Sequence, residues 1–306
     1  MMNLPLISIV LCTYNGERFL ITQLDSLLAQ SYRNFELLIS DDASTDSTKE
    51  ILNSYAADKR IKLFFQSQNI GPEKNFEFVL QQATGNLICC CDQDDYWVPE
   101  KIMLLYQSMG DSLLVYSDSE LTDDHGNSLH KKLSDLRKMY TGSQTTGFVF
   151  SNVVWGHALM FSHNLLTRIL PVPAGIPHDI WLAYRACTLG GIRYIDNPLT
   201  QYRQHSHTVT TSIPQKTLAR KKEERLKDYL AKLNWISVMA RYAQENEKEF
   251  YTSFLSLYQQ KQNGRFVWPL LTFMLVHRKQ LFMFSKKSVI SQVIEITKQC
   301  RGESAV

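Results

Sequence analysis

The chain has 306 residues, 44% of them hydrophobic and 21% charged, which is ordinary globular usage and excludes a disordered chain or a collagen-like fibre. Its formal net charge of +3 gives no reason to expect nucleic acid or another polyanion as a partner. The charge is unevenly spread, since residues 215–306 hold 17 basic and 8 acidic residues whereas residues 1–214 hold 16 basic and 22 acidic ones. This asymmetry indicates two regions with different roles.

Short β-rich apolar runs alternate with amphipathic stretches through the first 118 residues. The apolar runs predict five strands, at residues 7–12, 36–40, 61–66, 87–91 and 113–117. The stretches between them predict helices at 17–30, at 46–57, and from about residues 72 and 99. Strands separated by such helices are typical of βαβ units, so we expect an α/β fold with a mostly parallel sheet. Sheets of this kind bind ligands beyond the carboxyl ends of their strands.

The pattern is less regular between residues 122 and 214. Residues 122–147 are predicted to be a polar loop, and residues 155–170 a strand followed by a helix. A further helix is predicted at 179–188 and a strand at 192–195, ahead of another polar run. Beyond residue 214 charged helical patterns replace strands, so the chain is predicted to divide into residues 1–214 and a basic helical region, 215–306.

Several common catalytic motifs are missing from the sequence. It has no GxxxxGK[ST] phosphate loop, no GxG pair, no HExxH and no GxSxG. Its six cysteines include no CxxC pair, so we expect buried reduced thiols and neither disulfides nor a zinc site. The N-terminus lacks a secretory signal pattern and no run of about 18 apolar residues occurs, so a cytoplasmic location is expected.

Carboxylates that follow predicted strands are the candidate catalytic groups. Asp92, Asp94 and Asp95 come directly after the strand at 87–91 and would repel one another unless water or a cation intervened. Alternate residues of an extended segment share a side, so Asp92 and Asp94 can point into one cleft. Oxygen ligands of this kind suit Mg²⁺ or Mn²⁺ carrying a diphosphate. The alternative is a solvated acidic turn ahead of the helix near Pro99.

Other acidic positions and the histidines are ambiguous when taken singly. Asp41 and Asp42 follow the strand at 36–40 but belong to residue types that cap helices. Asp179 stands at the start of the helix predicted at 179–188, where capping and the helix dipole favour an acid without any catalytic role. The sequence alone does not decide between a structural and a functional role for three histidines: His157, His178 and His205.

Several segments combine into one pattern along residues 6–210. They are residues 9–16 (IVLCTYNG), 40–46 (SDDASTD), 69–71 (NIG) with Asn75 and Phe76, 91–97 (CDQDDYW) with Pro99 and Lys101, Trp155-Gly156, His178-Asp179, and 202–205 (YRQH). Together they closely resemble the family 2 glycosyltransferases of the GT-A fold, particularly bacterial rhamnosyltransferase-like members. Ala43 departs from the family, which usually has glycine there, and alanine is tolerable unless that residue needs a positive φ.

The resemblance implies an α/β GT-A (Rossmann-like) fold with a nucleotide-sugar half at about residues 1–118 and an acceptor half at about 119–214. It also implies residue roles. Thr13, Tyr14 and Asp42 would line the nucleotide pocket, with Asp42 accepting from an N–H of the base. Asp92 would contact the ribose or the metal shell, Asp94 would ligate Mg²⁺ or Mn²⁺, Asp179 would be the catalytic base, and His205 a metal or diphosphate ligand. Lys74 would pair with a phosphate, unless it is a solvent-facing helix lysine.

The implied activity is inverting transfer of a sugar, with rhamnose as one candidate, from a UDP- or dTDP-sugar to a glycan or lipid-linked acceptor in bacterial surface polysaccharide synthesis. A divalent ion at the leaving diphosphate and a carboxylate base opposite it suffice for one displacement. Two alternatives stay open. A metal-dependent nucleotidyltransferase would need a glycine- and arginine-rich phosphate loop near residues 13–18, and an inactive binding-only homologue would be favoured by loss of Asp92, Asp94 or Asp179.

The basic region suggests a surface contact. Residues 216–232 carry seven basic against three acidic side chains, and residues 266–276 form an uncharged run rich in aromatic residues. Eleven residues are too few to cross a bilayer of about 30 Å. Aromatic residues beside cations suit a helix in the headgroup layer, which would place the protein peripherally on the inner face of the cell membrane. The alternative is packing on the catalytic domain or on a second copy in a homo-oligomer.

Overall fold

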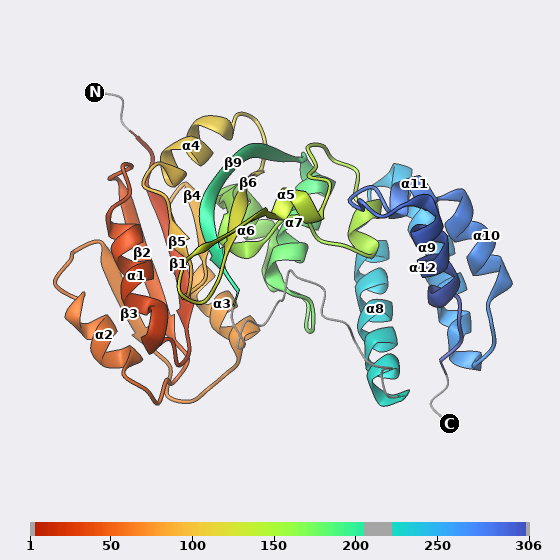
Figure 1. Ribbon diagram of the computed structural model, residues 1–306, viewed down its shortest axis with the longest axis horizontal. Coiled ribbons are helices and arrows are strands. Elements are labelled where there is room, and N and C mark those ends of the chain that lie inside the picture. Colours follow the sequence, from red (N-terminus) through yellow and green to blue (C-terminus); the bar gives the residue numbers. More distant parts are fainter. Residues whose placement is uncertain (1–3, 205–221, 304–306) are drawn as a thin grey trace.

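The computed structural model describes residues 4–204 and 222–303, and its centre is a nine-stranded sheet (Figure 1). The strand order is β3-β2-β1-β4-β8-β6-β9-β5, with β7 paired to β6. The strands are β1 (Ile7–Thr13), β2 (Phe35–Asp41), β3 (Ile61–Phe65), β4 (Leu87–Cys91), β5 (Tyr96–Trp97), β6 (Leu114–Thr122), β7 (Ser128–Lys132), β8 (Leu159–Ser162) and β9 (Ile192–Arg203). β1, β2, β3, β4, β6 and β9 run in one direction and the others oppose them. The predicted α/β architecture with a mostly parallel sheet is confirmed.

Helices cover both faces of the sheet. They are α1 (Glu17–Leu28), α2 (Thr48–Ser54), α3 (Pro72–Leu80), α4 (Lys101–Ser108), α5 (Leu133–Leu136), α6 (His163–Ile169), α7 (His178–Leu189), α8 (Lys222–Tyr242), α9 (Glu245–Gln259), α10 (Trp268–Val276), α11 (Arg278–Leu281) and α12 (Val289–Gln299). Short 3-10 helices are η1 (Thr146–Val149), η2 (Gly156–Ala158) and η3 (Gln260–Asn263). Local chemistry sets several of their starts: Pro72 suits the first turn of α3, and the Ser162 hydroxyl caps α6 by accepting from the Leu165 N–H.

Alternation along the central strands separates two buried cores. In β1, Ile9 and Leu11 face the core covered by α1, α2 and α4, whereas Val10 faces the core covered by α3, α6 and α7. This two-sided burial explains why the central strands read as continuous apolar runs. Because both faces are covered, the carboxyl edge of the sheet is where polar side chains can gather.

The helices from α8 onward pack on the second of these cores. Their buried residues belong to the same apolar cluster as those of α7. Polar bonds strengthen the contact: Trp235 Nε1 donates to the Phe148 carbonyl at 2.9 Å, and the Tyr184 hydroxyl donates to the Met239 carbonyl at 2.6 Å. Figure 1 shows these helices side by side at the end of the molecule opposite β3.

Two parts of the sequence-based prediction were wrong. β9 runs to Arg203, well beyond the predicted end at residue 195, because it continues along β6 through register shifts near Asp118. The predicted loop at 122–147 contains β7 and α5, which pack against β6. The cysteines are free, as expected. Within residues 4–204 and 222–303, no helix is both long enough and apolar enough to span a bilayer.

Candidate active site

Three neighbouring parallel strands bring polar residues to one edge of the sheet. The register pairs Thr13 with Asp41 and Leu11 with Cys91, so the residues that follow β1, β2 and β4 meet at this edge. The Thr13 hydroxyl donates to Asp41 Oδ1 at 3.0 Å, and the Asp42 N–H donates to the Thr13 carbonyl at 2.9 Å. Two of the predicted nucleotide-pocket residues, Thr13 and Asp42, therefore lie side by side.

The Asp42 carboxylate is buried and holds the loop that opens α3. Its Oδ1 accepts from the Ile70 N–H at 2.7 Å and its Oδ2 from the Gly71 N–H at 2.9 Å. Contact with a nucleotide base would use the remaining lone pairs of these oxygens, and it stays a prediction. Lys74, farther along α3, is exposed, and its pairing with a phosphate is likewise untested.

Tyr14 presents an accessible ring next to these residues. Its N–H donates to Gln93 Oε1 at 3.0 Å and its carbonyl accepts from Gln93 Nε2 at 3.1 Å, while the residue is 46% exposed. These reciprocal bonds tie the loop after β1 to the acidic segment after β4.

Ala43 lies in the turn that follows β2, with a φ of +59°. The Asp41 carboxylate shapes the turn, because it accepts from the N–H and the hydroxyl of Ser44. The left-handed region favours glycine, which the resembling family usually has at this position. Alanine is therefore strained here.

Asp92, Asp95 and His157 form a group that could hold a metal ion, with one ligand atom from each lying within 4.8 Å of the others. His157 Nδ1 lies 3.6 Å from Asp92 Oδ2 and 3.7 Å from Asp95 Oδ2. Asp95 Oδ2 is buried and accepts no hydrogen bond from the described residues, whereas Oδ1 accepts from the Arg203 N–H at 3.1 Å. An orphaned carboxylate oxygen beside a second carboxylate and an imidazole fits a divalent cation.

The ionisation of the group also suits a cation. Burial raises the pKa of Asp92, but the neighbouring His157 and the charges of His178 and Lys101 outweigh it, so the pKa falls below its usual value. Burial and the charges of Asp94 and Asp92 raise the pKa of Asp95 well above its usual value. A bound cation would lower the pKa of Asp95 again, because it would stabilise the ionised carboxylate.

The surroundings of His157 favour its neutral imidazole, which is the form that binds a metal ion. Burial lowers its pKa, although the Asp92 carboxylate 3.6 Å away opposes the shift. Its Nε2 lies 3.0 Å from the Ser119 hydroxyl and its ring stacks on Tyr202 at 4.3 Å between centroids. If Nε2 carries the proton and donates to Ser119, the Nδ1 lone pair faces the two carboxylates.

This group differs from the predicted pair of ligands, because Asp95 is included and Asp94 is not. The turn after β4 buries Asp95, while the Asp94 carbonyl accepts from Arg203 Nε at 2.9 Å. A metal-binding role for the Asp94 carboxylate stays a prediction. His205, the other predicted ligand, lies outside the described residues.

Asp179 is fixed by two donors at the start of α7. Its Oδ1 accepts from the Ile180 N–H at 2.7 Å and its Oδ2 from Asn152 Nδ2 at 3.0 Å. Burial and then the charge of Asp92 raise the pKa of Asp179, while His178 and the two donors limit the rise. A carboxylate with a raised pKa accepts a proton more readily than an ordinary one, which is what a general base requires.

Gly156 brings the two acidic groups together. A Cβ on Gly156 would lie 2.9 Å from His178 Nε2 and 3.9 Å from Asp179 Cβ, so a larger residue here would press on the His178 ring. His178 in turn stacks on Phe76 with ring centroids 3.9 Å apart. Because His157 adjoins Gly156, the segment that contributes to the metal-binding group runs directly beside the candidate base.

Sequence reasoning assigned no role to several supporting residues. Lys101 Nζ is buried, donates to the His157 carbonyl and, at 2.7 Å, to the Thr200 hydroxyl, and lies 3.5 Å from the Trp97 ring centroid. Burial lowers its pKa to about 8. Lys101 belonged to the resembling pattern and His157 followed Trp155-Gly156, so both carried some signal. Asn152 carried none.

Comparison with known proteins gives the family. The family model described as Glycosyl transferase family 2 matches residues 8–169. An uncharacterized glycosyltransferase of Haemophilus influenzae is 37% identical over 131 residues, which cover 42% of this chain and 52% of that relative. The match thus spans about half the length of this curated relative.

Solved structures share the fold at low sequence identity. The crystal structure of S. aureus TarS 1–349 in complex with UDP-GlcNAc has a TM-score of 0.59 and 17% identity, covering 96% of this chain and 81% of that one. The mannosyltransferase PcManGT from Pyrobaculum calidifontis, in complex with GDP-Man and Mn²⁺, has a TM-score of 0.56 and 16% identity, covering 97% and 80%. The family match and these likenesses confirm a GT-A-like fold with a helical C-terminal region, and the chain belongs to glycosyltransferase family 2.

Proposed function

We propose that this protein transfers a sugar from a nucleotide-sugar donor to a hydroxyl of a glycan or lipid-linked acceptor, with inversion at the anomeric carbon. The observation that carries the proposal is the pairing at the sheet edge: a cation-ready group, Asp92, Asp95 and His157, runs beside a fixed carboxylate with a raised pKa, Asp179. Residues 1–214 would be the catalytic domain, with a nucleotide-sugar half to about residue 118 and an acceptor half from about 119. Residues 215–306 would support it.

Asp179 would act as the general base. As the acceptor oxygen attacks the anomeric carbon, its proton passes to Asp179 while the bond to the diphosphate oxygen breaks. Asn152 and the Ile180 N–H hold the carboxylate in one orientation, so its free lone pairs are presented without reorganisation. One displacement inverts the anomeric centre and requires no covalent enzyme nucleophile.

The donor would lie across the ends of β1, β2 and β4. The Tyr14 ring would stack on the base, Asp42 would accept from a base N–H, and Asp92 would contact the ribose or the metal shell. Two solved structures of the same fold hold UDP-GlcNAc and GDP-Man. We propose a UDP- or dTDP-sugar, with rhamnose as one candidate sugar and surface polysaccharide as the product.

Asp92, Asp95 and His157 would hold a divalent ion, with Asp94 and His205 as further candidate ligands. A bound ion would stabilise the negative charge that develops on the leaving diphosphate. Carboxylate oxygens together with an imidazole nitrogen favour Mn²⁺ over Mg²⁺, which prefers oxygen ligands alone. The PcManGT structure contains Mn²⁺.

A lipid-linked acceptor would explain the exposed apolar side chains of the C-terminal helices. Six of the eleven exposed large hydrophobic residues in the described ranges lie in α10 and α12, with Trp268 at 69% and Ile290 at 74% exposure. Exposed lysines lie between the two helices at 279, 286 and 287. Aromatic and aliphatic side chains beside cations suit the headgroup layer of an anionic membrane, where we propose that the protein docks peripherally.

Thermal-shift screening against UDP-, dTDP- and GDP-sugars, with Mn²⁺, Mg²⁺ or EDTA, tests the donor and the ion. A ligand that binds the folded state raises stability by RT ln(1 + [L]/Kd), so the true donor should raise Tm in the presence of Mn²⁺ and much less in EDTA. Nucleoside diphosphate release should follow the same order. Binding of a donor without any turnover would indicate an inactive, binding-only homologue.

A further inference from the structure

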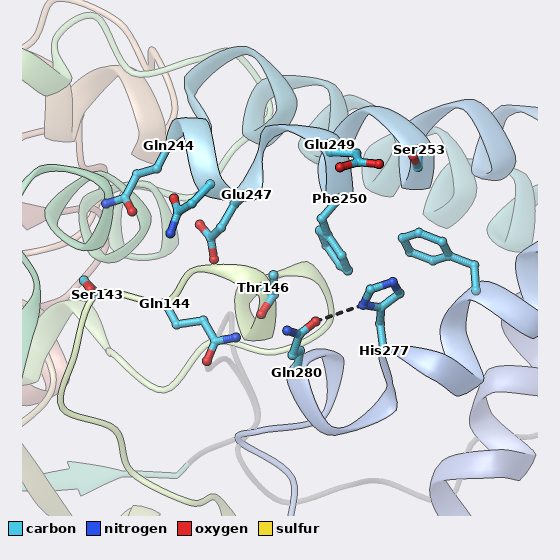
Figure 2. A pocket seen from close by; sticks show the side chains of 12 residues that line it. Ser143, Gln144, Thr146, Gln244, Glu247, Glu249, Phe250, Ser253, His277 and Gln280 are labelled. Atoms are coloured by element: carbon cyan, nitrogen blue, oxygen red, sulfur yellow. Dashed lines mark hydrogen bonds between the residues drawn. The ribbon is translucent and has the colours of Figure 1, made fainter.

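A cavity of about 570 Å³ lies between residues 143–146 and the helices α9, α10 and α11 (Figure 2). Its volume falls within the range of about 300–1,000 Å³ that small-molecule sites occupy. None of the residues that line it belongs to the candidate active site, so it requires a separate account.

Thr146 lines this cavity and carries a hydroxyl that no described residue uses. The residue is 2% exposed, and its Oγ1 is buried without a hydrogen-bond partner among the described residues. Leaving a buried hydroxyl without a hydrogen-bond partner destabilises the folded state, so a ligand group that bonds to it would offset that cost. Figure 2 shows Gln144, Thr146, Glu247 and Gln280 converging on the same space.

The polar lining can donate and accept, but it repels anions. Four side-chain amides contribute to it: Gln144, Gln244, Asn246 and Gln280. Two carboxylates, Glu247 and Glu249, also line the space, and among the described residues no lysine or arginine does. Glu247 is buried and fixed, since it accepts from the N–H of Thr145 at 3.0 Å and from the Thr145 hydroxyl. A phosphate or carboxylate ligand would be repelled by these two carboxylates, because no lysine or arginine of the described residues lines the cavity to offset their charge.

Aromatic rings complete the lining. Phe250 and Phe273 lie with centroids 5.3 Å apart and planes tilted by 40°, and His277 packs at 4.4 Å from Phe273. His277 Nδ1 lies 3.0 Å from Gln280 Oε1, which ties the aromatic and amide parts together (Figure 2). A ring face that receives apolar C–H groups, beside amides that both donate and accept, matches an uncharged sugar ring with its hydroxyls.

We propose that this cavity is a second carbohydrate site, which binds an uncharged saccharide unit away from the reacting centre. That the saccharide is a non-reacting part of the acceptor glycan rests on the proposed function, whereas the binding itself does not. Thr146 opens η1, and Asn152, which donates to Asp179, follows six residues later. A glycan anchored in the cavity would therefore be held by the same segment that orients the candidate base.

Saturation-transfer NMR of the full chain with maltotriose, cellotriose and chitotriose tests the proposal directly. We expect at least one neutral trisaccharide to bind, and Thr146→Val to weaken it at least tenfold while leaving Tm unchanged or higher, because valine removes an unpaired hydroxyl without changing the shape. Gln280→Leu should weaken binding similarly. Thr252→Val is the matched control on α9, where the hydroxyl donates to the Lys248 carbonyl and faces solvent.

The outcomes separate this site from the proposed activity. Asp179→Asn should bind the trisaccharide as the wild type does, even where transfer is lost. Absence of binding to all three sugars would overturn the proposal, as would a folded Thr146→Val protein with unchanged affinity. Displacement of the trisaccharide by a nucleotide sugar would assign the signal to the donor site instead.

Discussion

At Ala43 the backbone has a φ of +59°, a conformation that glycine adopts freely and alanine does not. The Asp41 carboxylate accepts a hydrogen bond from the Ser44 N–H, and this contact fixes the turn at residue 43. The strain of a left-handed non-glycine residue is about 1 kcal/mol or somewhat more. The protein carries this cost at a turn beside the proposed nucleotide site.

We expect Ala43→Gly to raise the free energy of unfolding by about 0.5 kcal/mol, because the relieved strain exceeds the added freedom of the unfolded chain. Ala231→Gly, at an exposed position inside α8, should lower it by about 1 kcal/mol. Urea denaturation measures both. If the two variants lose similar stability, Ala43 is not strained.

Asn152 is a positioning residue for Asp179, and its removal has a predictable sign. Its amide donates to the Asp179 carboxylate and limits the rise of that pKa, so Asn152→Ala should raise the pKa further. A base works when deprotonated: activity is present above its pKa and is lost as pH falls through it. The acid limb of the kcat profile should therefore move to higher pH, with kcat reduced about tenfold at neutral pH.

The control for this variant is Asn164→Ala, at an exposed position on α6, which should leave the profile unchanged. A lower kcat with an unshifted acid limb would show that Asn152 only supports the fold. Measurement of kcat between pH 4.5 and 9 distinguishes these results.

Part of the site was predictable from residue types that end strands. Asp92 was singled out in this way, because parallel strands deliver their carboxyl ends to one edge. Thr13 and Asp42 were assigned only through the resemblance to the family, and their contacts with a nucleotide stay predictions. Asn152 could not be found, since its role depends on a contact between segments 27 residues apart. The sequence also could not show that Asp95, and not Asp94, joins the cation-ready group. The turn after β4 breaks the strict alternation of an extended segment, on which the prediction of Asp94 depended.

At the scale of elements, Glu36 joins four segments of the sheet. Its carboxylate accepts from the Ser8 hydroxyl in β1 at 2.6 Å, from Lys62 Nζ in β3 at 2.9 Å, and from the N–H and hydroxyl of Thr84 ahead of β4. Burial alone would raise its pKa, but these donors overcome that effect and lower it from 4.5 to about 2.

Because the pKa of Glu36 is lower in the folded state, its ionised form stabilises the fold above about pH 4.5, and this contribution is lost as pH falls toward 2. Glu36→Gln should lower the free energy of unfolding by about 2 kcal/mol at pH 7 and by much less near pH 2.5. Glu50→Gln, exposed on α2, is the control. An equal loss at both pH values would mean that packing, not charge, stabilises this junction.

Strands could be predicted from the sequence where the local run of apolar residues coincides with the segment that pairs in the sheet. The strands at 7–12, 36–40 and 87–91 are almost wholly buried and stand out in the sequence as apolar runs. The strand at 61–66 lies at the edge of the sheet and is only partly buried, but its β-rich residue types still predict it. The predicted strand at 192–195 was shorter than β9 because the residues that follow it are mostly polar. The pairing of β9 with β6 shifts register there and then continues, which only the folded sheet can dictate.

At the scale of the whole molecule, the C-terminal helices are bound to the catalytic core. Thr145 and Glu247, together with Trp235 and Phe148, link α8 and α9 to the segment that leads to Asn152. Removing these helices would uncover a core shared with α7, so deletion is a poor test of their function. Point substitutions on their exposed surface are better suited.

We expect Lys286→Glu/Lys287→Glu to weaken binding to anionic phospholipid vesicles by tenfold or more, because each nearby lysine contributes about 1 kcal/mol. Lys59→Glu/Lys131→Glu makes the same change of net charge at exposed positions outside the C-terminal helices and should bind as the wild type does. Vesicle sedimentation at 0.05 M and 0.5 M salt measures this, since screening should remove the difference. If both double variants lose vesicle binding equally, the loss reflects net charge alone and the C-terminal helices do not form a specific membrane contact.

In the proposed reaction Asp179 takes the acceptor proton, while the group around Asp92 and His157 serves the leaving diphosphate. Release of nucleoside diphosphate from the donor, with water or an added glycan as acceptor, measures this step for the wild type and for Asp179→Asn. We predict that kcat falls by about 10² or more while donor affinity, measured by thermal shift, is retained. A variant that keeps its turnover and loses donor affinity would show that Asp179 is not the base and would assign it to the nucleotide pocket.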